Sequence, residues 1–196
     1  MFSNRLVGAA IRRMRMMRDV VEPGVLRHAR RSRALESLHG FAFTKLIVVC
    51  QGNINRSAFA EAYARLRAPS LPVESCGLHR VSGRPSPELS ISAAASLGVA
   101  LGAHRSQSTV QLSIDGALIV GFEEHHLHAW PDVHMHGART ILLGTFSENP
   151  RTRLYLPDPY RQSLAYTTRV FRDVQGCVDG LMSRVESGPS GSWRLT

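Results

Sequence analysis

The sequence lacks long apolar runs and has few cysteines. None of its apolar stretches approaches the roughly 20 residues that a membrane-spanning helix needs. The N-terminus lacks the apolar core of a secretory signal, because its apolar residues are interrupted by Arg12, Arg13, Arg15 and Arg18. The sequence has three cysteines, which are too few for a disulfide framework: Cys50, Cys76 and Cys177. We therefore expect neither a membrane span nor a secreted domain stabilised by disulfides.

Acidic residues are scarce relative to basic ones, but the imbalance is concentrated at one end of the chain. The formal net charge is +9 over 196 residues. Residues 1–44 hold nine arginines against three acidic residues, a net of +6, so the remainder carries only +3. Although basic proteins often bind nucleic acid, no aromatic platform or recognisable binding module accompanies these arginines. We expect no nucleic-acid partner.

Residues 1–40 are predicted to be a basic, helical N-terminal extension. Apolar side chains recur at helical spacing among its arginines, at Ile11, Met14, Met17 and Val21. Pro23-Gly24 would end this helix, and a second one would run from about residue 25 to residue 38. Four interpretations stay open: a helix packed on the domain or an unstructured tail, a segment that adsorbs to an anionic membrane, an arm for a partner, and a misassigned start codon.

Residues 41–187 are predicted to form one α/β domain. The apolar content of 43% is enough for a core, and the length suits one such domain. Short apolar runs predict strands at 46–49, 71–75, 117–120 and 139–143, and they alternate with helical patterns at 58–66, 86–97, 123–129 and 164–185. This alternation predicts a central four-stranded parallel sheet with helices on both faces. Residues 188–196 are predicted to be a disordered tail.

The motif Cys50-Gln51-Gly52-Asn53-Ile54-Asn55-Arg56-Ser57 directly follows the first predicted strand and leads into the first helix. Loop N–H groups at such a junction converge on an anion, and the helix dipole adds positive potential. That potential favours the nucleophilic thiolate form of a cysteine, while an arginine grips two oxygens of a tetrahedral oxyanion. We therefore predict a phosphate site at residues 51–57 with Cys50 as nucleophile. The alternative is a buried cysteine with a structural role only.

Asp158 lies between two prolines, between the fourth predicted strand and the last helix. The prolines stiffen the backbone on both sides, and the segment is also compatible with a plain turn. Cleavage of a phosphate ester by a thiolate needs a proton donor for the leaving oxygen. Ligands of parallel sheets bind beyond the C-terminal ends of the strands, where this loop is expected. Asp158 is therefore the candidate general acid.

Together these motifs resemble the low-molecular-weight protein-tyrosine phosphatases, in particular their bacterial branch. That family has a Cys-x5-Arg-Ser loop near its N-terminus and an Asp-Pro-Tyr loop near its C-terminus, and the resemblance covers roughly residues 43–186. It implies a cysteinyl-phosphate mechanism with Cys50, Arg56 and Asp158 as catalytic residues and with no cofactor. It also implies a phosphotyrosine protein as substrate, such as a bacterial tyrosine kinase of capsule or exopolysaccharide export. Because a reactive thiolate needs a reducing compartment, we expect a cytoplasmic protein.

The resemblance also implies supporting residues around the loop. In the family, hydrogen bonds hold the loop in its strained shape, and the matching residues are Asn53, Ser57, Ser75 and His104. The candidates for the slot around the aromatic ring are Ile54, His79 and Tyr160. In the family, the residue that Ser75 matches comes after the second strand, and the residue that His104 matches comes after the second helix.

The chain departs from the family pattern at several positions. Asn55 stands where many members have a second, protective cysteine, and Ala117 and Phe122 replace residues common around the third strand. These departures leave open a catalytically silent phosphotyrosine-binding module. A further alternative is arsenate reductase on the same fold, which needs a relay of additional thiols. We predict structural roles for Cys76 and Cys177, which disfavours that relay.

Histidines are unusually frequent in the second half of the chain, at His125, His126, His128, His134 and His136. Metal sites combine such histidines with cysteines or carboxylates at characteristic spacings. No such pattern completes a site in this sequence. We therefore predict a solvated helix and loop in this region, and no metal.

Overall fold

The computed structural model describes residues 24–130 and 132–196. The amphipathic helix expected around residues 11–21 lies outside these described residues. Within the described ranges, no helix combines the length and the apolar character that a bilayer crossing requires.

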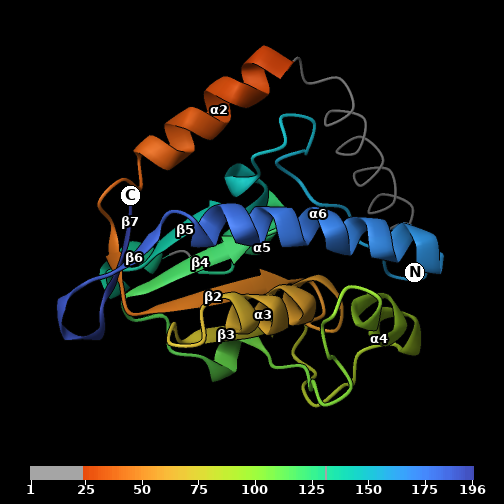
Figure 1. Cartoon of the computed structure of the whole chain (residues 1–196). Coiled ribbons are helices and arrows are strands. Elements are labelled where there is room, and N and C mark those ends of the chain that lie inside the picture. The colour runs from red at the N-terminus through yellow and green to blue at the C-terminus, as the bar shows by residue number, and fades with distance from the viewer. Residues whose placement is uncertain (1–23, 131) are drawn as a thin grey trace, which may run out of the picture.

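A four-stranded parallel sheet forms the centre of the molecule (Figure 1). Its strands are β2 (Lys45–Cys50), β3 (Val73–Gly77), β4 (Ala117–Gly121) and β5 (Arg139–Leu142). They lie in the order β3-β2-β4-β5, and each neighbouring pair is parallel. The strands are largely apolar runs rather than alternating patterns, as expected when both faces of a sheet are covered. The predicted α/β class with a four-stranded parallel sheet is confirmed.

Alternate residues of β2 point into two different cores. Leu46 and Val48 belong to the larger core, where helices cover the sheet. In this core Phe59 stacks on Phe171 at a centroid distance of 4.2 Å. The helices that cover this core or pack on it are α3 (Arg56–Arg67), α4 (Glu88–Ala95) and α6 (Leu164–Met182). This packing places the start of α3 beside the carboxyl end of the sheet.

The opposite face carries a smaller core that includes Ile47 and Val49. Short elements and loops cover it instead of long helices: the 3-10 turn η2 (Val133–His136) and the loop that follows the 3-10 turn η1 (Thr109–Gln111). The helix α5 (Glu124–Leu127) contacts β4 and β5 on the same side. A side chain at Gly121 would collide with Leu127 of α5, because its Cβ would lie 2.7 Å from Cδ2. Glycine at this position therefore lets α5 pack directly on the end of β4.

A second, antiparallel sheet joins the segment just before β2 to the C-terminal segment of the chain. It consists of β1 (Ala42–Phe43), β6 (Val185–Ser187) and β7 (Trp193–Leu195) in the order β1-β7-β6. We expected residues 188–196 to be a disordered tail, but β7 pairs with β1, and Leu195 is buried in the larger core. The glycine and serine content of this segment does not reveal the pairing, because its partner strand lies at the other end of the domain.

The helix α2 (Gly24–Glu36) belongs to the N-terminal extension and forms where a second helix was expected. It packs against the 3-10 turn η3 (Leu143–Phe146) that follows β5. The Nη2 atom of Arg31 donates to the carbonyl oxygens of Gly144 at 3.0 Å and Thr152 at 3.2 Å. The side chain of Arg30 donates to the hydroxyl of Tyr155 at 3.2 Å. These contacts attach α2 to the segment that leads to Asp158.

Candidate active site

The loop between β2 and α3 wraps closely around the thiol of Cys50. The strand ends at Cys50 and the helix begins at Arg56, so residues 51–55 alone make the turn. Asn53 has φ of 51°, in the left-handed region that few residues other than glycine adopt. This conformation lets its backbone N–H donate to the Sγ atom of Cys50 at 3.3 Å. The thiol therefore lies at a helix N-terminus among loop N–H groups, which is a setting for anion binding.

A polar network around the side chain of Asn53 holds the loop in this conformation. Its Nδ2 atom donates to the hydroxyls of Ser57 at 2.9 Å and Ser75 at 2.6 Å. Its Oδ1 atom accepts from the backbone N–H of Gln107 at 2.7 Å, and its carbonyl oxygen accepts from Nε2 of His104 at 2.7 Å. The structure thus brings together the residues predicted to support the loop: Asn53, Ser57, Ser75 and His104.

The hydroxyl of Ser57 lies 3.0 Å from the Sγ atom of Cys50. This hydroxyl oxygen accepts from Asn53, and its hydrogen can point to the sulfur or to the carbonyl oxygen of Cys76, which lies 3.5 Å away. A glycine completes the close packing on the other side of the loop. A Cβ at Gly77 would lie 2.8 Å from the carbonyl carbon of Gly52 and 2.9 Å from the backbone nitrogen of Asn53. Any larger residue at position 77 would therefore displace the loop.

The sequence did not single out Glu61, which completes the network from α3. The hydroxyl of Ser75 donates to its Oε2 atom at 2.5 Å, and the side chain of Arg65 pairs with its Oε1 atom at 2.6 Å. His104 faces the same carboxylate, with Nδ1 at 3.8 Å. Glu61 is buried, and a buried carboxylate is stable only when it is paired or hydrogen-bonded. The pair with Arg65 is local to α3, but the partners Ser75 and His104 come from β3 and from the loop after α4, so sequence spacing does not reveal this network.

Arg56 is buried at the centre of the site, with only 1% of its side chain exposed. Its Nη1 atom donates to Oε1 of Glu123 and to the carbonyl oxygen of Leu156, both at 2.8 Å. Its guanidinium lies over the ring of Phe122, 5.3 Å from the centroid. Burial by itself would lower the pKa of Arg56, but the charges of Asp158, Cys50 and Glu123 outweigh burial and raise it. The guanidinium therefore stays charged.

Asp158 reaches the site from the loop before α6. Its Oδ2 atom lies 3.3 Å from Nη2 of Arg56, and its Oδ1 atom accepts from the backbone N–H of Tyr160 at 3.1 Å. The side chain remains 42% exposed and borders the pocket above the loop. The lining residues of this pocket are Cys50, Gln51, Gly52, Ile54, Asn55, His79, Arg84, Asp158 and Tyr160. The predicted nucleophile, the predicted acid and all the predicted slot residues thus border one pocket.

The three residues that depart from the family pattern are all buried. Asn55 is buried, and its Oδ1 atom accepts from the hydroxyl of Ser90 on α4 at 2.6 Å. Phe122 is buried beneath the guanidinium of Arg56. Ala117 begins β4, fully buried in the smaller core. These departures therefore leave the loop and its arginine in place.

The remaining thiols, Cys76 and Cys177, are fully buried in different cores. Burial raises the pKa of each to about 12, so both remain neutral thiols. Such thiols are poor nucleophiles. Their surroundings are those of structural cysteines.

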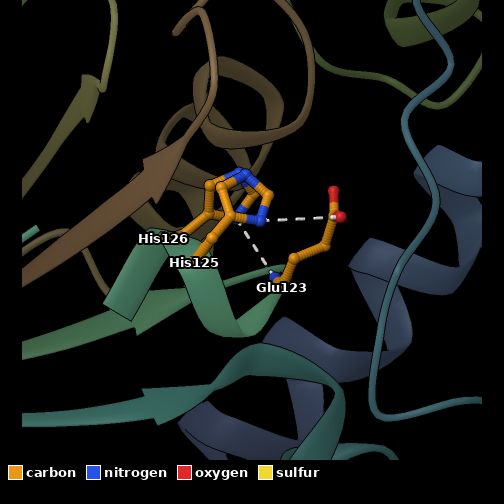
Figure 2. A group of neighbouring side chains, drawn as sticks. All are labelled: Glu123, His125 and His126. Atoms are coloured by element: carbon orange, nitrogen blue, oxygen red, sulfur yellow. Dashed lines mark hydrogen bonds and ion pairs between the residues drawn. The ribbon is translucent and has the colours of Figure 1, made fainter. Parts of the chain in front are cut away.

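One group of described side chains could bring metal ligands together, namely Glu123, His125 and His126, whose ligand atoms lie within 4.8 Å of one another (Figure 2). The Nδ1 atom of His126 accepts from the backbone N–H groups of Phe122 at 3.2 Å and Glu123 at 3.1 Å. The proton of the neutral ring must therefore be on Nε2, which leaves neither nitrogen free for a metal. The adjacent charge of Arg56 also opposes a cation. These residues do not fit a metal site.

The environment of His126 differs from the solvated helix that we expected. The side chain is fully buried, and burial, together with the charges of Arg56 and His125, lowers its pKa to about 2. His126 is thus a neutral ring that caps the start of α5 and orients the backbone of Glu123. The expectation was wrong for His126, because this contact depends on how α5 packs at the end of β4, whereas His128, His134 and His136 are exposed as expected.

The parallel α/β sheet, with a cysteine and an arginine in the loop after β2, forms an oxyanion site next to a thiol, which is the kind of site that a cysteine-dependent phosphatase requires. The family model described as low molecular weight phosphotyrosine protein phosphatase matches residues 45–189. The chain belongs to this family of protein-tyrosine phosphatases, as the resemblance indicated. The match begins after α2 and β1, so the N-terminal extension lies outside it.

Several of the similar proteins are bacterial. The chain is 32% identical over 126 residues to the low molecular weight protein-tyrosine-phosphatase Etp of Escherichia coli (strain K12), covering 62% of this chain and 80% of that protein. Among solved structures, Vibrio vulnificus Wzb in complex with benzylphosphonate aligns with a TM-score of 0.60 and 26% identity over 72% of this chain and 98% of that one. The tyrosine phosphatase Wzb from Escherichia coli K30, in complex with sulphate, aligns with a TM-score of 0.61 and 25% identity over 72% and 97%.

Proposed function

We propose that this protein-tyrosine phosphatase acts through a cysteinyl-phosphate intermediate at Cys50, with Arg56 as the phosphate clamp and Asp158 as the general acid. The observation that carries the proposal is that Cys50 and Asp158 border one pocket although they lie far apart in the sequence, and that Arg56 lies 3.3 Å from Asp158. Cys50 and Arg56 come from the loop after β2, whereas Asp158 comes from the loop before α6.

In the first step, the thiolate of Cys50 attacks phosphorus, a sulfur–phosphorus bond forms, and the bond from phosphorus to the tyrosyl oxygen breaks. Loop N–H groups and Arg56 stabilise the charge on the equatorial oxygens. The Nε atom of Arg56 is buried and has no hydrogen-bond partner among the described residues, so it is a donor available to such an oxygen. Protonated Asp158 gives its proton to the departing phenolate.

In the second step, a water molecule attacks the phosphorus of the intermediate while ionised Asp158 accepts the proton of that water. The sulfur–phosphorus bond breaks, and inorganic phosphate and the thiolate of Cys50 are released. The hydroxyl of Ser57, 3.0 Å from this sulfur, can donate to the departing thiolate and stabilise it. No step requires a metal or another cofactor.

The alternatives gain no support from the site. A thiol relay for arsenate reduction would need accessible thiols, whereas Cys76 and Cys177 are buried and neutral. A silent binding module would not need an acid beside the clamp, yet Asp158 lies 3.3 Å from Arg56. Hydrolysis of a phosphate ester therefore accounts for more of the site than either alternative.

We further propose that the physiological substrate is a bacterial tyrosine kinase of capsule or exopolysaccharide export and that the enzyme works in the cytoplasm. The support is the similarity to bacterial phosphatases such as Etp and Wzb. A cytoplasmic location would also keep the thiolate of Cys50 reduced.

The test is turnover of para-nitrophenyl phosphate and of a phosphotyrosine peptide, with a metal chelator present throughout. We expect activity in the wild type and none in Cys50→Ser, which should still bind phosphate or vanadate through the loop N–H groups and Arg56. The matched control is Cys76→Ala, which removes a buried thiol in the adjacent strand and should retain turnover. Steady turnover by Cys50→Ser would refute the assignment of the nucleophile.

A further inference from the structure

The side chain of Arg84 lies at the rim of the active-site pocket without a carboxylate partner. It lines the pocket together with His79, from the segment that follows β3. Among the described residues, no carboxylate lies within ion-pair distance of its guanidinium, and no hydrogen bond occupies its donors. A guanidinium with unused N–H donors next to a substrate pocket is suited to bind an anionic group of the substrate in addition to its phosphate.

The backbone around Arg84 is held in place rather than loose. Its N–H donates to the hydroxyl of Ser106 at 3.0 Å, and its carbonyl oxygen accepts from the N–H of Ser106 at 2.9 Å. Gly83 donates to the carbonyl oxygen of the same serine at 2.7 Å, and Pro85 forms an antiparallel bridge with Arg105. These bonds fix the point from which the guanidinium reaches over the pocket.

The guanidinium reaches the loop that is proposed to hold phosphate. A Cβ built at Gly52 would lie 3.9 Å from Nη1 of Arg84 and 3.7 Å from Cδ2 of His79. Both side chains therefore lie directly above Gly52. A tyrosyl phosphate bound at Cys50 would bring the neighbouring residues of its peptide past this rim.

A second positive charge lies next to Tyr160, one of the residues that line the pocket. Arg161 is exposed and lies over the ring of Tyr160, 5.2 Å from its centroid. Among the described residues that line the pocket, Asp158 provides the one carboxylate, and it is paired with Arg56. Arg84 at the rim and Arg161 beside Tyr160 thus add positive charge near the approaching peptide, and among the described residues neither forms an ion pair with a carboxylate.

We propose that the enzyme prefers phosphotyrosine flanked by acidic residues and that Arg84 is the main side chain that binds them. The inference rests on the proposed function, because it concerns the substrate of the same pocket. The rim is open to solvent, so the preference should be of the size typical of an exposed ion pair, roughly two- to fivefold in kcat/KM. It should shrink as the ionic strength rises.

The test compares phosphotyrosine peptides that are identical except for glutamate, glutamine or lysine beside the phosphotyrosine. For the wild type, we expect kcat/KM to be highest with glutamate and lowest with lysine. In Arg84→Gln the ratio of glutamate to glutamine peptide should fall close to one, and in Arg84→Glu it should drop below one. The ratio is taken within each variant, so a general loss of activity does not affect it.

The matched control is Arg80→Glu, which makes the same charge change on an exposed arginine of the same segment that does not line the pocket. This variant should keep the wild-type ratio. The proposal is wrong if the wild type shows no preference, if Arg84→Gln retains it, or if Arg80→Glu removes it as completely as Arg84→Glu. Binding of the same peptides to Cys50→Ser, compared as a ratio of affinities for the glutamate and glutamine peptides, measures the preference without turnover. Absence of turnover by the wild type would contradict the proposed function, whereas equal affinities would contradict the role of Arg84.

Discussion

The Nη2 atom of Arg56 lies 3.3 Å from the Oδ2 atom of Asp158, while Nη1 of the same guanidinium donates to Glu123 at 2.8 Å. One buried arginine thus links the phosphate loop, the end of β4 and the loop before α6. Because an ammonium group cannot reproduce these simultaneous contacts, the site depends on the planar fork of arginine.

Asp158→Asn should separate protonation of the leaving group from binding of phosphate. Turnover of phosphotyrosine should fall by roughly two to four orders of magnitude, the usual contribution of general acid catalysis. An aryl phosphate whose phenol is very acidic needs less protonation, so its first step should slow less. Burst kinetics with a series of aryl phosphates measures this dependence on the leaving group.

The binding of inorganic phosphate serves as the control for Asp158→Asn and should hardly change, because Asp158 does not belong to the loop that cradles the anion. If the variant keeps full activity on phosphotyrosine, the segment around Asp158 is only a turn. Glu123, whose carboxylate contacts Arg56, would then be the next candidate for the acid, whereas Asp115 lies before the opposite end of β4.

Peroxide should inactivate the enzyme with poor recovery. Asn55 stands where many relatives have a second thiol, and it is buried against Ser90. The sulfenic acid of Cys50 would therefore lack an adjacent thiol and could oxidise further to irreversible forms. The measurement is the activity recovered with dithiothreitol after prolonged exposure to excess peroxide.

Asn55→Cys is the matched variant for this oxidation experiment, because it restores the second thiol beside the arginine. It should recover a larger fraction of its activity than the wild type. Full recovery of the wild type would contradict the prediction and would point to protection by another group, with Cys76 the first to test.

His126 should make the stability of the protein sensitive to acid. Its pKa in the folded state, about 2, lies below the ordinary value of 6.5, so the unfolded chain binds a proton between these values that the folded chain does not. The stability that depends on neutral His126 is fully present above pH 6.5 and is lost as the pH falls toward 2. The slope from this group is at most about 1.4 kcal/mol per pH unit.

His126→Asn keeps an acceptor near the position of Nδ1 but cannot be protonated in this range. The variant should be less stable than the wild type at pH 7, because it leaves a cavity. Its free energy of unfolding, measured by denaturant titration from pH 7 to pH 5, should decline less steeply than that of the wild type. Parallel pH profiles of the two proteins would show that His126 does not control the acid sensitivity.

Arg31→Ala should weaken the attachment of α2 to the domain. The substitution removes hydrogen bonds to the carbonyl oxygens of Gly144 and Thr152. Loss of bonds from a charged donor should lower the free energy of unfolding by about 1–3 kcal/mol. Thermal unfolding measures the change, and Arg33→Ala is the control on the exposed side of the same helix. Equal melting temperatures for the two variants would show that α2 contributes no stability through Arg31.

The sequence by itself determined the elements whose signals are local. An apolar strand, a loop with Cys50 and Arg56, and a helix follow one another directly in the chain, and the flanking prolines mark the loop of Asp158. The resemblance to the phosphatase family added residues that no periodicity reveals, such as Ser75 and His104, and the structure places both against Asn53.

Only the tertiary structure decided the contacts between distant segments. The pairing of Glu123 with Arg56, the burial of His126 and the position of Arg84 above Gly52 depend on how loops from different strands meet at one sheet edge. The pairing of β7 with β1 likewise joins segments from opposite ends of the domain. Such contacts leave no trace in local spacing or composition, because each side chain gains its partner only when the sheet has assembled.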